Sequence, residues 1–142
     1  MQDRILIDAG PLIALFNSRD NYHKEVCDFM GKHKLSYIST LAVYAEVSHI
    51  LSRNRNAQRD FYEWVSYKGI ILSDINQNDM IRITELTEKY ADLPMDFADA
   101  TLVIAAEKSG IRQIISIDKD FDIYRLPGKE KIVNVFKKND EP

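Results

Sequence analysis

Short aliphatic segments without polar alternation recur along this chain of 142 residues, and they constrain its fold more than any other feature. Alternation of apolar and polar residues is typical of a strand with one face in water, whereas an unbroken aliphatic segment is typical of a strand covered on both faces, as in parallel sheets. The segments are Ile5–Ile7, Tyr37–Ser39, Ile70–Leu72 and Ile114–Ile117, with Ile132–Val135 as a fifth candidate. The sequence therefore predicts a mainly parallel sheet of four or five strands.

The stretches between these segments carry apolar residues at intervals of three and four, which is the spacing of one face of an α-helix. The expected helices cover residues 12–16, 22–30, 41–53, 57–65, 80–90 and 94–106. Gly110 follows the last of them, where a helix often ends in a glycine. Strands that alternate with helices predict an α/β fold of three layers, with helices on both faces of the sheet.

Length and composition set further limits. The chain is 45% hydrophobic and 29% charged, which excludes disordered and collagen-like classes. Its single cysteine, Cys27, cannot form an internal disulfide, and no apolar run reaches the roughly 18 residues of a membrane span. We expect one domain over residues 1–136, a polar tail over 137–142, and a location in the cytoplasm without membrane contact.

The net charge bears on nucleic-acid binding. Lysine and arginine number 19 and aspartate and glutamate 22, so the net charge is −3. A protein that binds phosphates by bulk charge alone is basic. Any binding of nucleic acid by this chain must therefore use local basic patches or metal ions.

Acidic residues stand after two of the expected strands. Asp8 comes directly after Ile5–Ile7, and Asp118 directly after Ile114–Ile117, with Asp120 two residues later. An aspartate after a strand is often only a turn former or a helix cap. Parallel strands, however, bring the residues at their carboxyl ends to one edge of the sheet, where ligands bind. We therefore expect these two strands to be neighbours and their acids to share one crevice.

Two further acids lie on expected helices. Glu46 sits at the edge of the apolar arc of the helix over residues 41–53, and Asp99 lies in a helix that is apolar nearly all round. A carboxylate at the core boundary or in the core is costly unless it is paired with a cation or metal. Alternatives remain: Glu46 can reach solvent or an arginine, Asp96 can cap its helix, and Asp99 can belong to a buried salt bridge.

Carboxylates gathered from distant parts of the chain would repel one another, and a hard divalent cation resolves that conflict. Ligands that are all oxygen favour Mg²⁺ or Mn²⁺ over zinc. Magnesium bound by few carboxylates keeps waters and open positions, which suits phosphate substrates. The acids therefore point to metal-assisted hydrolysis of phosphodiester bonds.

At this point the chain resembles the PIN-domain family, and in particular the VapC-type toxins of bacterial toxin–antitoxin pairs. The matching motifs occur in family order over nearly the whole chain. They are Leu6–Leu15, Ser39–Val47, Asp96–Ala100 and Ser116–Phe121. Ala9 departs from the family, which often has threonine or serine there.

The resemblance implies a Mg²⁺- or Mn²⁺-dependent endoribonuclease whose acidic quartet is Asp8, Glu46, Asp99 and Asp118. Asp96, Asp120 and Ser116 match positions of secondary importance near the metal site. The resemblance also implies an RNA substrate, a small antitoxin protein as partner, and a homodimer. A housekeeping RNA-processing nuclease and a non-catalytic metal- or RNA-binding module stay open as alternatives. Phosphoryl transfer by Asp8 lacks an acid at position 10, which is glycine.

Basic residues give candidate RNA contacts. Arg53, Arg55 and Arg59 cluster where two helices should meet, and Lys119 lies between two of the acids. Clustered basic residues are the electrostatic footprint of nucleic-acid binding, although a solvated polar face is the commoner explanation of such a run.

Overall fold

The computed structural model describes residues 3–136 and contains one five-stranded sheet. Every pairing within it is parallel, and the strand order is β3-β2-β1-β4-β5. The strands are β1 (Asp3–Ile7), β2 (Leu35–Ser39), β3 (Ile70–Leu72), β4 (Gln113–Ile115) and β5 (Val133–Asn134). The predicted parallel sheet is confirmed, and so is the pairing of β1 with β4. The expected tail over residues 137–142 lies outside the described residues.

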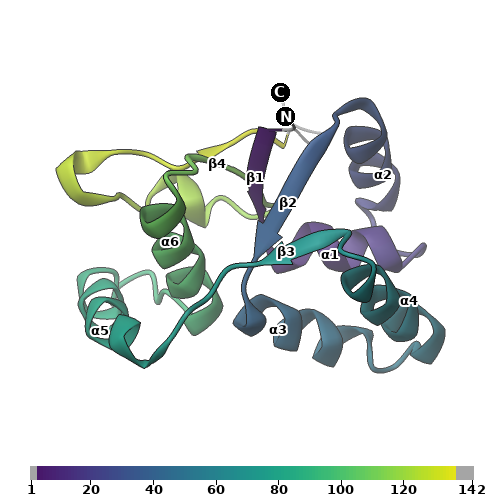
Figure 1. Ribbon diagram of the computed structural model, residues 1–142, viewed down its shortest axis with the longest axis horizontal. Coiled ribbons are helices and arrows are strands. Elements are labelled where there is room, and N and C mark those ends of the chain that lie inside the picture. Colours follow the sequence, from purple (N-terminus) through teal and green to yellow (C-terminus); the bar gives the residue numbers. More distant parts are fainter. Residues whose placement is uncertain (1–2, 137–142) are drawn as a thin grey trace.

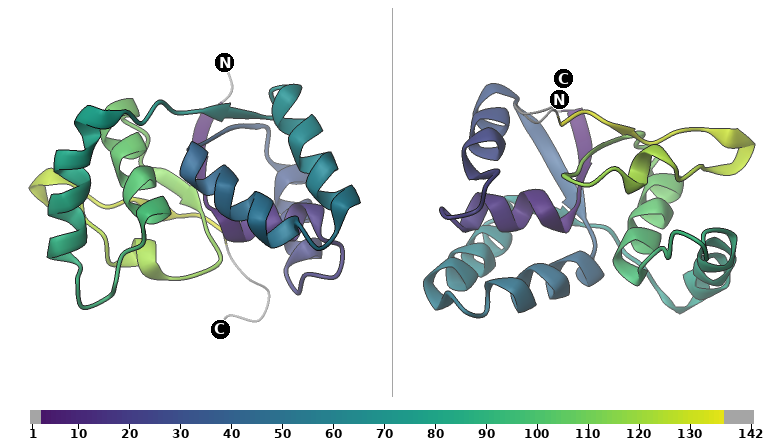
Figure 2. Two further views of the ribbon diagram at one scale, coloured as in Figure 1. Left: turned by 90° about the horizontal axis from the view of Figure 1, so that it is seen from below. Right: turned by 180° about the vertical axis from the view of Figure 1, so that it is seen from behind.

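Over residues 3–136, six α-helices connect and cover the strands. They are α1 (Ala9–Phe16), α2 (His23–Lys32), α3 (Leu41–Leu51), α4 (Arg55–Ser66), α5 (Met80–Lys89) and α6 (Phe97–Ser109). The helices α1, α2 and α4 lie on one side of the sheet and α5 and α6 on the other, while α3 runs past the edge where β2 ends (Figures 1 and 2). This arrangement confirms the predicted three-layer α/β fold.

Two predicted boundaries near the acids differ from the structure. The strand expected over Ile114–Ile117 ends at Ile115, because Ser116 leaves the ladder and pairs with the Asn134 side chain instead. The helix expected over residues 41–53 ends at Leu51, and Asn54 then caps the next helix by accepting a hydrogen bond from the Ala57 N–H. Arg53 therefore lies in the connection between two helices.

The central aliphatic segments form the core, as the absence of alternation predicts. In the edge strand β3, however, Ile71 and Leu72 are exposed, so the expected coverage on both faces is wrong for that segment. Ile5, Leu6 and Ile7 of β1 and Ile114 and Ile115 of β4 are completely buried. Helix α6 is buried along nearly its whole length, from Ala98 to Ala106, which matches its uniformly apolar sequence. Asp99, in the first turn of this helix, is thereby held against the core.

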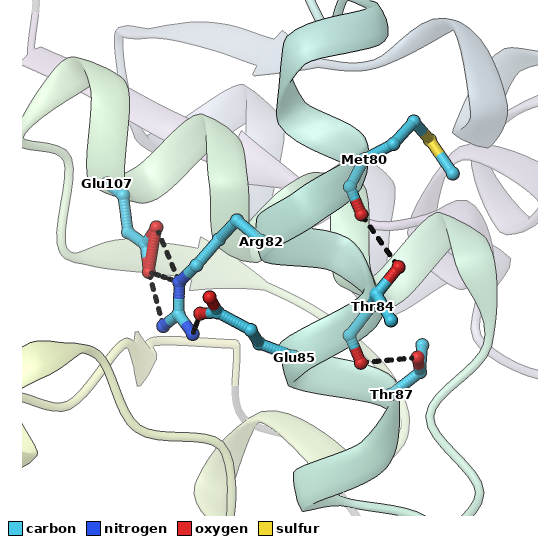
Figure 3. Close-up of polar contacts among 6 residues, drawn as sticks. All are labelled: Met80, Arg82, Thr84, Glu85, Thr87 and Glu107. Atoms are coloured by element: carbon cyan, nitrogen blue, oxygen red, sulfur yellow. Dashed lines mark hydrogen bonds and ion pairs between the residues drawn. The ribbon is translucent and has the colours of Figure 1, made fainter.

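Ion pairs tie α5 to the outer surface of α6. The Arg82 guanidinium donates to Glu107 of α6 at 2.7 Å and to Glu85 of its own helix at 3.3 Å (Figure 3). Within α5, Thr84 donates to the Met80 carbonyl and Thr87 to the Thr84 carbonyl (Figure 3). Partly exposed pairs of this kind contribute about 0–1 kcal/mol each. They fix the position of α5 and lie on the far side of α6 from the sheet.

The chain changes direction across the sheet between β1 and β4. From β1 the connections lead outward to β2 and β3, and the chain then returns to add β4 and β5 on the other side of β1. Such a switch point opens a crevice at the carboxyl ends of the two central strands, and ligands of α/β sheets bind there. Asp8 and Ser116 come directly after these strands.

Candidate active site

Asp8 follows β1 at this switch point and is 5% exposed. It is the N-cap of α1: one carboxylate oxygen accepts a hydrogen bond from the Ala9 N–H at 2.8 Å, and the other accepts from the Ser116 hydroxyl at 2.9 Å. Burial, and to a lesser extent the charges of Asp118 and Glu46, raises the pKa of Asp8 to about 7 despite these two hydrogen bonds. Ser116, a secondary candidate from the sequence, orients Asp8.

Asp99 lies in the first turn of α6 and is 6% exposed. One of its carboxylate oxygens accepts a hydrogen bond of 2.9 Å from the hydroxyl of Tyr124, which is itself 1% exposed. Burial, together with the charges of Asp8 and Asp96, raises the pKa of Asp99 to about 8. No ion pair neutralises Asp99 within the described residues, so the alternative of a buried salt bridge is wrong for this part of the chain.

Asp96 is the N-cap of α6, as one interpretation of the sequence predicted. Its carboxylate accepts a hydrogen bond of 2.7 Å from the Asp99 N–H, and the residue is exposed. The cap holds the first turn of the helix in place and so fixes the backbone of Asp99. Asp96 also adds negative charge to the site, because it raises the pKa values of Asp99 and Glu46.

Glu46 projects from the middle of α3 and is exposed. Partial burial, then the charges of Asp96 and Asp118, raise the pKa of Glu46, which places its carboxylate at the rim of the same acidic group. The start of α3 is joined to α6 by two buried hydroxyls, since Thr40 and Thr101 form a hydrogen bond of 2.7 Å. This contact fixes the helix of Glu46 relative to the helix of Asp99.

Asp118 and Asp120 lie in the loop after β4. Because β4 ends at Ile115, Asp118 stands three residues beyond the strand rather than directly after it, and it is exposed. Its carboxylate accepts a hydrogen bond of 3.1 Å from the Asp120 N–H, which shapes the loop. Burial and the charge of Asp118 raise the pKa of Asp120. The loop thus supplies an exposed carboxylate above the buried Asp8.

The structure therefore brings the six predicted acids into one electrostatic neighbourhood from four parts of the chain. Their donor set is all oxygen, and no ion pair neutralises either buried member, Asp8 or Asp99, within residues 3–136. These features fit Mg²⁺ or Mn²⁺ bound through two carboxylates and waters. In the described part of the chain, however, no three acid, histidine or cysteine side chains stand in an arrangement that would hold a metal ion. Mutual repulsion of carboxylates acts against such a cluster until a cation binds.

Three buried hydroxyls that position the acids were not predicted from the sequence: those of Tyr124, Thr40 and Thr101. Tyr124 comes after a short 3-10 helix, Asp120–Asp122, which is too short to give a periodic pattern in the sequence. Its place is set by edge-to-face ring contacts with Tyr90 and Phe121. The contact between Tyr90 and Tyr124 joins distant segments and leaves no local pattern in a single sequence.

The candidate RNA contacts fall in two places. Arg53 and Arg55 line an open cavity beyond the end of α3, where Arg19 joins them from the loop after α1. Arg59 is exposed one turn further along α4 and does not line that cavity. Lys119 is exposed in the loop between Asp118 and Asp120. The cluster predicted from the sequence is therefore divided: Arg53 and Arg55 line the cavity and Arg59 does not. Arg19, which is distant in the sequence, is the third arginine of the cavity.

Comparisons with known proteins agree with this fold. The PIN domain family matches residues 5–126, so the chain belongs to the PIN-domain family. Among solved structures it is similar to VapC20 of Mycobacterium tuberculosis, a toxin that cleaves the sarcin–ricin loop. The two share 18% sequence identity with a TM-score of 0.76, over 83% of this chain and 92% of that one. The search of curated proteins returned no match to this chain.

None of the helices over the described residues combines the length and the apolar character that crossing a membrane requires.

Proposed function

We propose that this protein is a Mg²⁺- or Mn²⁺-dependent endoribonuclease and the toxin of a type II toxin–antitoxin pair. The observation that carries the proposal is the pair of buried carboxylates, Asp8 and Asp99, at the switch point of a PIN-domain sheet. Both are held by hydrogen bonds but lack a cationic partner in the described chain. A structural role alone does not account for two adjacent uncompensated acids, since their burial costs stability.

Asp8 and Asp99 would hold the cation, with the carboxylates of Glu46 and Asp118 above them at the rim. A bound divalent ion supplies charge for the phosphate oxygens and lowers the pKa of a bound water. The chain's own groups prepare this site. The Ser116 hydroxyl and the Ala9 N–H fix both oxygens of Asp8, and the Tyr124 hydroxyl fixes one oxygen of Asp99.

Glu46 is suited to handle a proton. Its carboxylate is exposed, so substrate and water can reach it, and partial burial together with the neighbouring acids raises its pKa above the ordinary value. A general base works best when its pKa approaches the working pH. We assign Glu46 the role of accepting a proton from the attacking water at a carboxylate oxygen.

The toxin assignment has separate support. The similar fold of VapC20, a toxin that cleaves the sarcin–ricin loop, favours a toxin with an RNA substrate. The same assignment implies a small antitoxin protein as partner, a homodimer and a cytoplasmic location. A housekeeping nuclease would share the site but would not stop growth when produced without an antitoxin.

Cleavage of several structured RNAs by the purified protein tests the activity. We expect cleavage with Mg²⁺ or Mn²⁺, none with EDTA, and a large loss of cleavage by Asp99→Asn with either metal. Asp60→Asn is the matched control, because Asp60 is an exposed acid on α4 outside the site, and this variant should cleave as wild type. Cleavage by Asp99→Asn at the wild-type rate would contradict the proposal.

Induced expression in bacteria tests the toxin assignment. Wild-type protein should arrest growth, whereas Asp99→Asn protein, produced in equal amount, should not. Normal growth with an active nuclease present would favour the housekeeping alternative.

A further inference from the structure

A cavity of about 660 Å³ opens at the end of the molecule away from the acidic crevice. It lies where the loop after α1 meets the connection between α3 and α4, and its lining consists of three arginines, three asparagines and Ser18. The arginines are Arg19, Arg53 and Arg55. The cavity, which we call the arginine cavity, thus joins side chains more than thirty positions apart in the sequence.

The local charge of this cavity is opposite to that of the whole chain. The chain carries a net charge of −3, yet among the described residues no acid lines the cavity. Nor does Arg19, Arg53 or Arg55 form an ion pair in that part of the chain. Guanidinium groups bind phosphate oxygens through paired, charge-assisted hydrogen bonds. Three of them without an acidic partner form a site for an anion rather than a structural network.

The walls of the cavity are ordered by local hydrogen bonds. The Asn17 side chain accepts from the Arg19 N–H at 3.1 Å, and the Asn54 side chain accepts from the Ala57 N–H at 3.1 Å. Each asparagine therefore shapes the backbone next to an arginine of the cavity. The three arginines themselves are exposed and can reach a ligand without any rearrangement of the fold.

Two helices connect the acidic crevice with the arginine cavity. Helix α1 begins directly after Asp8 and ends beside Asn17, a distance of about 13 Å at 1.5 Å per residue. Helix α3 carries Glu46 and ends two residues before Arg53. The two helices pack against each other and run the same way (Figure 2). A polyanion that is bound to the acids through a cation therefore needs to extend only a short distance along these helices to contact the arginines.

We propose that the arginine cavity binds phosphate groups of the RNA that flank the bond to be cut. This inference rests on the proposed nuclease function and adds to it the position of a substrate subsite. RNA is favoured over an acidic protein segment because the cavity is in line with the two helices that bear the acids. The subsite includes Arg19, which the sequence cluster lacked, and leaves out Arg59.

Binding of a short fluorescein-labelled oligouridine, followed by fluorescence anisotropy in EDTA, tests this assignment without cleavage. Each phosphate contact contributes about 0.7 to the slope of log affinity against log salt for a single strand. The double variant Arg19→Gln/Arg53→Gln should bind more weakly than wild type and reduce this slope by about 1.4. Arg59→Gln is the matched control and should keep the wild-type slope. Thermal melts should show that both variants fold.

The outcomes separate this inference from the nuclease proposal. An unchanged slope in the double variant, or an equal loss in Arg59→Gln, overturns the subsite even if wild type cleaves RNA with Mn²⁺. The subsite is also overturned if a labelled polyglutamate peptide binds in a way that depends on the arginines while the oligouridine does not bind. A reduced slope in the double variant supports the subsite, and if no metal then gives cleavage, only the nuclease proposal fails.

Discussion

Two pairs of carboxylates meet at the acidic crevice, and they differ in how the fold treats them. The inner acids, Asp8 and Asp99, are 5% and 6% exposed, and buried hydroxyls fix their orientation. The outer acids, Glu46 and Asp118, are exposed. Burial of uncompensated charge costs stability, whereas exposed carboxylates are screened by water. Of the two pairs, it is therefore the inner one whose burial lowers the stability of the folded protein. We take these inner acids to be the direct metal ligands.

The largest expected effect comes from an inner acid. Asp99→Asn should reduce RNA cleavage by roughly a thousandfold, the rate equivalent of about 4 kcal/mol, because the amide is a poor ligand for a hard cation. Its melting temperature in EDTA should equal or exceed that of wild type, since repulsion with Asp8 is relieved. A large drop in melting temperature would instead mark Asp99 as a structural residue.

The second effect is the pH dependence of stability in EDTA. Burial raises the pKa of Asp8 to about 7 and of Asp99 to about 8, so the folded protein retains protons that the unfolded chain has lost. Stability should therefore be greatest below about pH 4 as far as these groups are concerned, and fall as pH rises toward 8. The expected slope is up to about 1.4 kcal/mol per pH unit for each group.

Urea denaturation between pH 5 and pH 9 measures this slope. In the double variant Asp8→Asn/Asp99→Asn the fall should be much shallower, because neither side chain titrates. A wild-type protein whose stability rose over the same range would contradict the assignment of burial as the main cause.

A smaller effect is expected from the hydroxyl that orients Asp99. Tyr124→Phe removes one hydrogen bond, so Mn²⁺ affinity should fall about 10- to 100-fold, as is usual for groups that orient a metal ligand. Tyr90→Phe is the matched control, because the Tyr90 hydroxyl accepts from the Arg125 N–H away from the acids. Both variants should lose about 1 kcal/mol of stability. An equal loss of Mn²⁺ affinity in the two would show that Tyr124 acts only through packing.

The smallest effect on the fold should come from an outer acid. Glu46→Gln should change stability by less than about 0.5 kcal/mol, since the side chain is exposed. Cleavage at pH 7 should fall at least about tenfold through loss of a proton acceptor, and Mn²⁺ affinity should change little. Loss of Mn²⁺ affinity as large as in Asp99→Asn would remove the distinction between inner and outer acids.

Much of this architecture could be predicted from the sequence. The aliphatic segment Ile5–Ile7 identified a strand covered on both faces, and the uniformly apolar helix around Asp99 identified burial. Both signals are local, because they depend on the order of residues within one short segment. The grouping of Asp8 with Asp118 was expected from the geometry of parallel strands.

The rest depends on contacts between distant segments. The hydrogen bond from Tyr124 to Asp99, the Thr40–Thr101 link between two helices, and the meeting of Arg19 with Arg53 all join parts of the chain that no local pattern relates. The early end of β4 has the same origin, because the Asn134 side chain takes the backbone groups of Ser116 that would have extended the ladder.

Binding of Mn²⁺, followed by electron paramagnetic resonance at pH 7.5 or above, tests the central claim most directly. The inner acids are held to be the ligands, and a ligand must lose its proton to bind. Wild-type protein should bind Mn²⁺, Glu46→Gln should bind it with similar affinity, and Asp8→Asn/Asp99→Asn should show no binding at that site. Equal affinity in wild type and the double variant would contradict the account.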